Sequence, residues 1–259
     1  MKISLVTVCF NSEKTIAETF ESVLRQTYRS IEYIVVDGMS RDGTLEIIRR
    51  YETRFAERGV DFRWISEKDK GLFDAMNKGV GMATGDVIGI LNSDDILAVP
   101  EAFEKIAATF ERDRCDAVYS DLYVMDYETM QIPNRVFIAG KGSYKRGWYP
   151  PHPTLYLRRE IYEKYGRYSL KYRVAADYDF MVRIMKQGIR MSYIPEVLVH
   201  MRAGGVSTQS LKAYKRSFDE AVDVLRANGV ALPFCVNVLR TIMLFMQRLR
   251  GMRKGRKKS

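Results

Sequence analysis

The chain has 259 residues, 46% of them hydrophobic, and its formal net charge is +10. This size suffices for one large globular domain, or for one domain with an appendage. Three widely separated cysteines exclude a disulfide framework and a zinc-binding spacing, and they fit a reducing cytosol. The N-terminus enters a strand pattern directly, without a separate apolar region or a cleavage site, so we expect no secretory signal.

The first 120 residues alternate between predicted strands and predicted helices. Short apolar runs predict the strands, and apolar residues at helical spacing predict the helices. In chain order we expect a strand over 3–9, a helix from a cap at Asn11 or Ser12 to about 25, a strand over 31–36, a helix over 44–55, a strand over 62–65, a helix over 73–80, a strand over 86–91, a helix over 100–110 and a strand over 117–120. This alternation predicts an α/β fold with a central, mostly parallel sheet and helices on both faces.

Residues 121–232 follow a different pattern. Residues 121–139 are rich in Tyr, Val and Met and contain turn signals, which predicts irregular antiparallel strands. Residues 140–153 form a predicted loop with three glycines, three prolines and Trp148. A helix over 178–186, a strand over 191–194 and a helix over 210–227 are expected to follow.

The C-terminal segment 233–259 joins an apolar stretch to a basic run. Residues 234–246 are apolar except for Asn237, Arg240 and Thr241, and residues 246–259 contain seven basic side chains and no acid. Thirteen helical residues span about 20 Å, against about 30 Å for a bilayer core, so we expect no transmembrane helix. We expect the segment to bind an anionic inner membrane surface. The alternative is a helix docked on the globular body with a disordered polar tail; a nucleic-acid partner is disfavoured, because no basic patch interleaved with aromatic residues occurs elsewhere.

The most informative stretch is Asn92-Ser93-Asp94-Asp95, which directly follows the apolar run 87–91. A buried strand directs its carboxyl end toward the ligand crevice of an open α/β sheet, so two adjacent carboxylates are expected there. They repel each other unless a cation or a sugar-phosphate complex joins them, and their hard oxygen atoms suit Mg²⁺ or Mn²⁺. The stretch indicates a site for a metal–nucleotide complex; an Asx turn that caps the helix after Pro100 is the alternative.

Asp37 ends the second predicted strand as Asp94 ends the fourth, so we expect both carboxylates at one edge of the sheet. The following loop, 38–44, has two glycines and a helix start, and it could hold a nucleoside by hydrogen bonds from Asp37 and from main-chain groups. A tight loop capped by Asp42 or Thr44 explains the same residues. The loop lacks the lysine-bearing phosphate pattern and the G-x-G-x-x-G fingerprint, which argues against ordinary NTPases and dehydrogenases.

Eight short segments resemble, in their order along residues 3–208, the family 2 glycosyltransferases of the inverting GT-A type. They are VTVCFN (6–11), VVDGMSRDGT (35–44), DAMNKG (74–79), ATGD (83–86), LNSDD (91–95), PHPT (151–154), ADYDFMVR (176–183) and GGVS (204–207). The resemblance implies a GT-A catalytic domain over 1–232. Its Rossmann-like nucleotide-sugar-binding half would cover 1–120, its acceptor half 121–232, and a membrane-associating extension would follow over 233–259. The closest likeness is to bacterial enzymes of exopolysaccharide, capsule or lipopolysaccharide synthesis.

The resemblance assigns the nucleotide-sugar to the first half. Asp37 would contact the nucleoside base. Asp94 and Asp95 stand where the family has its Asp-x-Asp signature, so Asp95 would bind Mg²⁺ or Mn²⁺, with Asp94 near the ribose or diphosphate and as a second candidate ligand. The other positions carried over to the nucleotide side are Ser40, Asp69 and Asp74.

Asp177 stands where the family has its general base. An inverting transfer needs a carboxylate that takes the proton of the acceptor hydroxyl as this hydroxyl attacks the anomeric carbon. The start of a helix favours the ionised form that a base requires. A helix N-cap is the alternative role for Asp177, and Asp179 is the fallback base.

The acceptor side and a lid are assigned from the same resemblance. His152, between two prolines, and Trp148 are expected to border the acceptor, although His152 could equally be a packed loop residue. Closure of a mobile loop over the diphosphate would exclude water. The predicted lid residues are Arg202, Gly204 and Gly205. His200 lies earlier in the chain than the histidine of many relatives, so we expect a structural role for it.

Together these features predict an inverting, metal-dependent hexosyl- or N-acetylhexosaminyl-transferase in bacterial surface polysaccharide synthesis. It would move one sugar from a nucleotide-sugar, with UDP favoured as the family's commonest nucleotide, to a lipid-linked oligosaccharide. GDP- and dTDP-sugars stay open. A sugar nucleotidyltransferase would need a basic glycine-rich loop after the first strand, which is absent, and an inactive membrane-bound partner of another transferase is opposed by the retained carboxylates. The expected location is the cytoplasm, at the inner face of the cell membrane.

Overall fold

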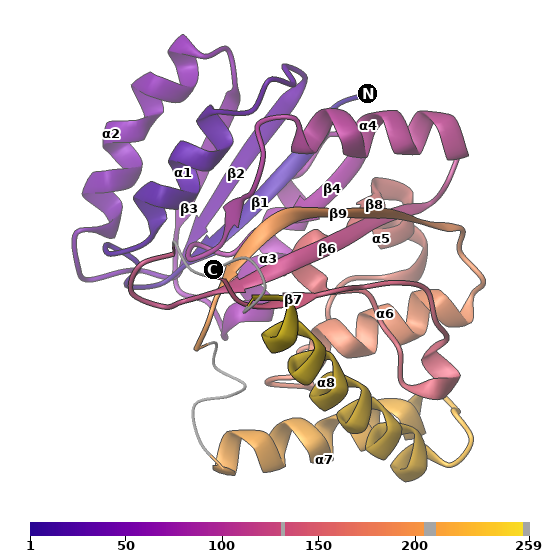
Figure 1. Cartoon of the computed structure of the whole chain (residues 1–259). Helices are drawn as coiled ribbons and strands as arrows, with labels where there is room; N and C mark the ends of the chain where they lie inside the picture. Colours follow the sequence, from indigo (N-terminus) through magenta and orange to yellow (C-terminus); the bar gives the residue numbers. More distant parts are fainter. Residues whose placement is uncertain (131–132, 205–210, 256–259) are drawn as a thin grey trace.

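The structure is a computed structural model, and it describes residues 1–130, 133–204 and 211–255. Within these residues nine strands form one sheet with the order β3-β2-β1-β4-β8-β6-β9-β5, and β7 pairs with β6 outside this path. Helices cover the sheet on both sides, with α1, α2 and α4 on the near side and α6 and α7 toward the lower right of Figure 1. The predicted α/β fold is confirmed.

The first half builds the parallel part of the sheet. Its strands are β1 (Ile3–Cys9), β2 (Ile31–Asp37), β3 (Asp61–Ser66) and β4 (Val87–Ile90), and its helices are α1 (Ile16–Leu24), α2 (Thr44–Glu57) and α3 (Leu72–Met82). Every residue of β1 and β2 is buried, as expected for strands that helices cover on both faces. Cys9 pairs with Asp37 at the carboxyl ends of β1 and β2, so the loops that follow these strands start side by side.

The remaining strands of the sheet have mixed directions. They are β5 (Ile96–Leu97), β6 (Ala117–Met125), β7 (Pro133–Phe137), β8 (Tyr156–Arg158) and β9 (Met191–Arg202). β6 runs parallel to β9 and antiparallel to β7 and β8, while β8 also pairs with β4 and so joins the two halves. The intervening elements are α4 (Ala102–Asp113), η1 (Tyr144–Arg146), η2 (His152–Thr154), α5 (Arg159–Tyr165) and α6 (Ala176–Lys186).

Two hydrophobic cores, one on each face of the sheet, follow from the alternation of side chains along the strands. One core joins Phe20 of α1 and Phe55 of α2 to Tyr33 of β2. The other joins β1, β4 and β8 to α3, α5, α6 and α7. The helix α3 lies close to the sheet because a Cβ on Gly79 would come within 2.3 Å of Cγ1 of Val6.

Two C-terminal helices complete the fold, α7 (Leu211–Ala227) and α8 (Pro233–Gly255). α8 packs on α7, β7 and η1, and Figure 1 shows it crossing in front of α6. Among the residues that the structure describes, no helix combines the length and the apolar content needed to cross a membrane.

Several boundaries differ from the prediction. The helix α1 begins at Ile16 after Thr15, so the predicted cap at Asn11 or Ser12 is wrong. β9 extends to Arg202 because it pairs along its length with β6 and β5, which no local pattern indicated. β5 and β8, of two and three residues, and the seven-residue helix α5 were not predicted, because elements this short carry little periodicity.

Candidate active site

Three loops meet at the carboxyl edge of the parallel strands. The amide of Asn11, after β1, donates to Oγ of Ser40, after β2, over 2.8 Å. The hydroxyls of Ser12 and Ser93, after β1 and β4, lie 2.9 Å apart and share a hydrogen bond. The amide of Ser12 donates to Oγ1 of Thr44 at the start of α2 over 2.8 Å. These contacts hold the loops that carry the predicted nucleotide-side residues in one rigid cluster.

Asp37 anchors this cluster from inside. Its side chain is fully buried, and its carboxylate accepts hydrogen bonds from the amide of Ser40 at 3.0 Å, from Oγ of Ser40 at 2.5 Å and from Oγ of Ser66 at 2.6 Å. Ser40 is also buried. Beside them, Phe10 and Met39 are 61% and 55% exposed, and they give this edge of the sheet two accessible apolar side chains. Asp37 and Ser40 therefore fix the loop on which these side chains stand.

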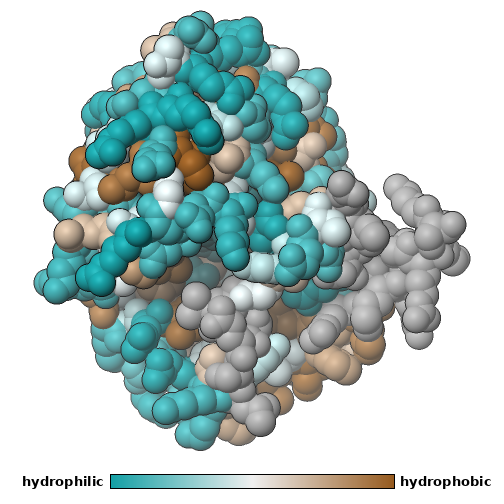
Figure 2. All heavy atoms as spheres, turned by 90° about the vertical axis from the view of Figure 1, so that its left-hand side faces the viewer, coloured by the Kyte–Doolittle hydropathy of each residue, from teal (hydrophilic) through white to brown (hydrophobic). Residues whose placement is uncertain are grey.

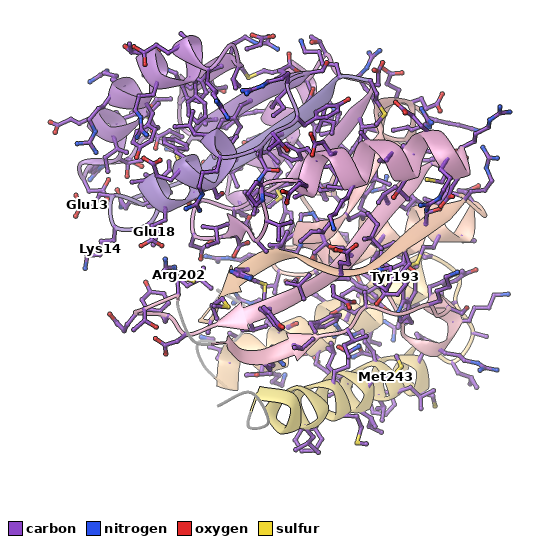
Figure 3. The ribbon with its side chains drawn as sticks, turned by 45° about the horizontal axis from the view of Figure 1, so that its top comes forward. Glu13, Lys14, Glu18, Tyr193, Arg202 and Met243 are labelled. Carbon is purple, nitrogen blue, oxygen red and sulfur yellow. The ribbon has the colours of Figure 1, made fainter. Side chains whose placement is uncertain are left out.

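Asp94 and Asp95 occupy different environments. Asp95 is 1% exposed, and its carboxylate accepts hydrogen bonds from the amide of Arg202 and from Nδ2 of Asn92, both at 3.1 Å. Asp94 is only half-buried. The side chain of Arg202 donates to the carbonyl of Asp94 and to Oε2 of Glu18, at 3.4 and 2.6 Å. Figure 3 shows Arg202 of β9 beside Glu18 of α1.

The carboxyl groups of Asp94 and Asp95 both have raised pKa values. Burial, and then the charge of Asp94, raise the pKa of Asp95 well above its ordinary value. Burial also raises the pKa of Asp94, against the opposing effect of the Arg202 guanidinium. Two neighbouring acids that ionise with difficulty gain from an added positive charge. This edge of the sheet therefore favours a cation or a cation–diphosphate complex.

The carboxylate oxygens of Asp94 and Asp95 suit a hard divalent cation, but other ligands must complete its coordination shell. Within the described residues no three His, Cys, Asp or Glu side chains gather in a metal-binding group. Mg²⁺ commonly binds through one or two carboxylates, with water and substrate phosphates as its other ligands. Asp94 fits this arrangement because it is only half-buried, whereas both oxygens of Asp95 already accept protein hydrogen bonds.

Asp69 and Asp74 flank the start of α3. Oδ1 of Asp69 accepts from the amide of Gly71 at 2.7 Å, and its other oxygen lies so close to Gly38 that a Cβ there would come within 2.4 Å. Oδ2 of Asp74 accepts from the amide of Lys70 at 2.9 Å. Asp69, which follows β3, thus lies against the loop after β2, and Asp74 fixes the turn that leads into α3.

A second cluster surrounds Asp177, in the first turn of α6. Its carboxylate accepts a hydrogen bond from the amide of Tyr178 at 2.7 Å, and its charge acts on both His152 and Tyr168. Nε2 of His152 lies 2.9 Å from the hydroxyl of Tyr168. Burial lowers the pKa of His152, and the Asp177 charge opposes this shift. The lowered pKa favours the neutral form of His152.

The helix α3 connects the two clusters. Nδ2 of Asn77 donates to the carbonyl of Tyr168, and Oδ1 of Asn77 accepts from the amide of the same residue, both at 2.9 Å. Phe73 packs against the ring of Tyr168 with the ring centroids 5.8 Å apart. Since α3 also packs on β1 and β2, the segment beside Asp177 is tied to the nucleotide-side loops.

Asp179 has a different environment from Asp177. It is buried, and its carboxylate accepts from Nδ2 of Asn228 at 3.0 Å and from Nη2 of Arg183 at 3.4 Å. These contacts tie α6 to the end of α7 and occupy both oxygens. Asp179 therefore serves the packing of helices, and the fallback choice of base loses its support.

Trp148, an acceptor-side candidate, and His200 are both half-buried and pack against aromatic rings. Nε1 of Trp148 donates to the carbonyl of Ala139 at 2.9 Å, and its ring lies 5.6 Å from that of Tyr119. The ring of His200 lies 5.6 Å from that of Tyr123, and burial lowers the pKa of His200. This ring contact supports the structural role that we expect for His200.

The predicted lid is corrected at Arg202. This residue ends β9, is 6% exposed, and holds Asp95, Asp94 and Glu18 together, so it cannot belong to a mobile loop. Gly204 is exposed with a φ of +100°, a conformation that favours glycine. Gly205 lies outside the described residues.

Comparison with known proteins identifies the family. A sequence model described as Glycosyl transferase family 2 matches residues 4–187. The chain belongs to glycosyltransferase family 2. The PGL/p-HBAD biosynthesis glycosyltransferase of Mycobacterium bovis (strain BCG / Pasteur 1173P2) is 30% identical over 207 residues, covering 79% of this chain and 78% of its own. The putative glycosyltransferase EpsE of Bacillus subtilis (strain 168) is 29% identical over 234 residues, covering 87% and 81%.

Solved structures give this glycosyltransferase the GT-A fold. S. aureus TarS 1–349 in complex with UDP-GlcNAc superposes with a TM-score of 0.67 at 18% identity, covering 94% of this chain and 72% of that chain. The mannosyltransferase PcManGT from Pyrobaculum calidifontis, in complex with GDP-Man and Mn²⁺, gives 0.67 at 18% identity, covering 99% and 73%. The chain spans 41% of the longer TarS chain.

Several residues of the glycosyltransferase site were missed from the sequence. The hydroxyl pair Ser12–Ser93, the ion pair Arg202–Glu18 and the partner of His152, Tyr168, all join segments far apart in the chain. Ser93 carried a signal through its place in LNSDD, whereas Glu18 and Tyr168 lie in none of the eight segments. A cavity of about 540 Å³ opens beside Asp116 and Ile189, which precede the amino ends of β6 and β9. It has no part in this site.

Proposed function

We propose that this glycosyltransferase transfers one sugar, with inversion, from a nucleotide-sugar to an acceptor hydroxyl, and that Asp177 is the general base. In such a displacement the base takes the hydroxyl proton while the oxygen attacks the anomeric carbon from the face opposite the leaving diphosphate. Asp177 suits this role because it is half-buried and starts α6, where the helix dipole favours its ionised form. His152 and Tyr168 beside it offer polar atoms that could orient the acceptor.

The donor is proposed to bind at the loops after β1, β2 and β4. Phe10 and Met39 offer an apolar contact for a nucleoside, and Asp69 offers a carboxylate beside Gly38. A divalent cation, Mg²⁺ or Mn²⁺, would neutralise charge on the leaving diphosphate. We assign it to Asp94, and we assign to Asp95, the first choice from the sequence, the task of fixing Arg202. UDP is the favoured nucleotide, with GDP and dTDP as alternatives.

The acceptor is proposed to be a lipid-linked saccharide in polysaccharide synthesis, so the enzyme would work at the inner face of the cell membrane. This proposal is supported by the extension 233–259, which combines apolar residues with eight basic ones and no acid. The Mycobacterium relative is named a PGL/p-HBAD biosynthesis glycosyltransferase, which supports a biosynthetic role.

The main support for the proposal is that α3 connects the nucleotide-side cluster to the cluster around Asp177. The first holds a strained carboxylate pair and the second holds Asp177 with His152. A thermal-shift panel of UDP, GDP and dTDP sugars with Mn²⁺ tests the donor side. We expect stabilisation by one nucleotide that needs both Mn²⁺ and Asp94. No response to any nucleotide would refute the donor assignment.

A further inference from the structure

The helix α8 exposes a large apolar face, although part of its inner face, at Val236, belongs to the hydrophobic core. Its outer face is exposed and almost wholly apolar. The exposed large hydrophobic residues on it are Phe234, Leu239, Ile242, Phe245, Met246 and Leu249, each between 37% and 60% exposed. Figure 2 shows brown, apolar spheres gathered at the lower right, on the side where α8 lies. A packed surface helix directs such residues inward.

The inner face of α8 is held by polar contacts. Nδ2 of Asn237, which is fully buried, donates to the carbonyl of Phe218 in α7 over 3.1 Å. Nε of Arg240 donates to Oδ1 of Asn237 over 2.8 Å, and Nε2 of Gln247 donates to the carbonyl of Ile138 over 3.1 Å. These contacts fix the roll of α8 about its axis, so its apolar face cannot turn inward without breaking them.

The inner face also reaches the proposed acceptor side. The Arg240 guanidinium lies 4.9 Å from the ring centroid of Tyr178 and 5.8 Å from that of Tyr149. Tyr178 follows Asp177 in α6, and Tyr149 lies three residues before His152. Whatever covers the outer face of α8 therefore lies against the half of the enzyme that holds Asp177.

We propose that the outer face of α8 docks on an anionic bilayer, with the helix lying in the plane of the membrane surface. The segment 233–259 contains eight basic residues and no acid, which complements anionic lipid head groups. An apolar face followed by basic residues is typical of helices that lie at a membrane interface. The 23 residues of α8 measure about 35 Å along the axis, at about 1.5 Å per residue, which gives a long strip of contact.

A second copy of the chain is a poorer occupant of this face. A two-fold symmetric contact through α8 would bring two basic, acid-free segments toward each other without a counter-charge. The bilayer offers both the apolar interior and the negative charge that the segment lacks. The proposal deepens the proposed function, because membrane docking through α8 would turn the acceptor half toward a lipid-linked acceptor.

The test compares two matched substitutions in the full chain. Ile242→Glu changes a residue of the outer face that is 52% exposed, and Leu170→Glu changes an apolar residue outside α8 that is 50% exposed. Sedimentation is measured with phosphatidylcholine vesicles that contain or lack phosphatidylglycerol. We expect the unchanged chain and Leu170→Glu to sediment only with phosphatidylglycerol. Ile242→Glu should bind at least about tenfold more weakly, because it loses the burial of one large aliphatic side chain.

Two results would overturn the proposal. One is equal sedimentation of the unchanged chain and Ile242→Glu. The other is a concentration-dependent dimer that Ile242→Glu dissociates, with no vesicle binding by either protein. The thermal shift with UDP and Mn²⁺ is measured on the same samples. An intact shift with failed sedimentation refutes the docking alone, whereas normal sedimentation without any nucleotide response refutes the donor assignment alone.

Discussion

The two halves of this glycosyltransferase hold their candidate functional carboxylates in different ways. On the nucleotide side, Asp37 and Asp95 are buried and each oxygen accepts a hydrogen bond from an amide or a short polar side chain. On the acceptor side, Asp177 is half-buried, and its surroundings are His152 and Tyr168. The carboxylates of the first arrangement accept hydrogen bonds at both oxygens, whereas the Asp177 carboxylate is less buried and accepts one from the amide of Tyr178 at 2.7 Å.

This difference indicates that the two clusters have different functions. A nucleotide diphosphate and its cation have constant geometry, so a rigid cluster of loops can be built for them in advance. Acceptors vary among glycosyltransferases, and an aromatic pocket around a carboxylate adapts more easily. We therefore expect substitutions in the first cluster to alter binding or stability, and substitutions in the second to alter turnover. The following predictions test this contrast, from the largest expected effect to the smallest.

Removal of the proposed base should have the largest effect. Asp177→Asn keeps the size of the side chain but cannot accept the hydroxyl proton, so turnover should fall by about 10²- to 10⁴-fold. Nucleotide binding should be unchanged. Release of nucleoside diphosphate and the thermal shift with UDP and Mn²⁺ give the two readouts. Asp179→Asn is the control, since it should retain turnover, and normal turnover by Asp177→Asn would eliminate the assigned base.

Loss of the Arg202 side chain should destabilise the fold. Arg202→Met removes the guanidinium that bonds to Glu18 and to the carbonyl of Asp94, and leaves the acidic pair without its nearest positive charge. Breaking a buried ion pair costs about 3–5 kcal/mol; the exposure of Glu18 reduces the expected loss to about 2–3 kcal/mol. Chemical denaturation measures it. An unchanged free energy of unfolding would mean that Arg202 does not brace this site.

Substitution of the accessible carboxylate should weaken donor binding. Asp94→Asn removes one charge from the proposed cation site, and we expect the Mn²⁺-dependent affinity for UDP to fall by about 10- to 100-fold, the range found when metal sites lose supporting groups. Titration calorimetry with and without Mn²⁺ measures this. If Asp94→Asn bound as tightly as the unchanged enzyme, the cation would have to lie elsewhere.

Metal binding should depend on pH in a defined direction. The raised pKa values of Asp94 and Asp95 mean that the folded protein keeps protons above the ordinary carboxyl range of about 4. Without a cation, the free energy of unfolding that these groups contribute decreases as pH rises from about 4. The reason is that the carboxyl groups of the unfolded chain lose their protons at lower pH than those of the folded protein. A cation favours the ionised pair. The thermal shift caused by Mn²⁺ and UDP should therefore grow as pH rises from about 4 toward neutral, and a shift independent of pH would contradict this.

The smallest effect is expected at Arg240. Arg240→Met keeps the aliphatic packing but removes the cation from the rings of Tyr149 and Tyr178, which should cost about 1 kcal/mol of stability. Urea denaturation measures it, with Arg173→Met at an exposed position as the control. Equal stability of both variants would indicate that α8 does not brace the acceptor side.

The sequence predicted the parallel half of the fold far better than the other half. β1 and β2 are continuous apolar runs that end at Cys9 and Asp37, so their type, ends and functional edge could be predicted from local pattern. β8 and the outer part of β9 depend on pairing with strands distant in the chain, which leaves little local signal. For this reason the sequence placed Arg202 in a loop, although β9 carries it beside Asp95.

The candidate site residues were likewise predictable only where a local pattern marked them. Asp94 and Asp177 could be proposed from the sequence because they belong to short segments that resemble the family. The different burial of Asp94 and Asp95 could not be predicted, because it arises from Arg202, which lies 107 residues from Asp95 along the chain. The exposed face of α8 was equally hidden. Its apolar residues surround most of the helix, and contacts with segments distant in the chain, such as those of Asn237 and Gln247, determine which face is exposed.

The location of a bound cation tests the central claim most directly. Crystals grown with UDP and Mn²⁺ can be measured at a wavelength where manganese scatters anomalously. We predict one strong peak within coordination distance of the Asp94 carboxylate, between it and the diphosphate, at the loops after β1, β2 and β4. A peak elsewhere in the protein, or a nucleotide bound at this edge without manganese, would contradict the assignment.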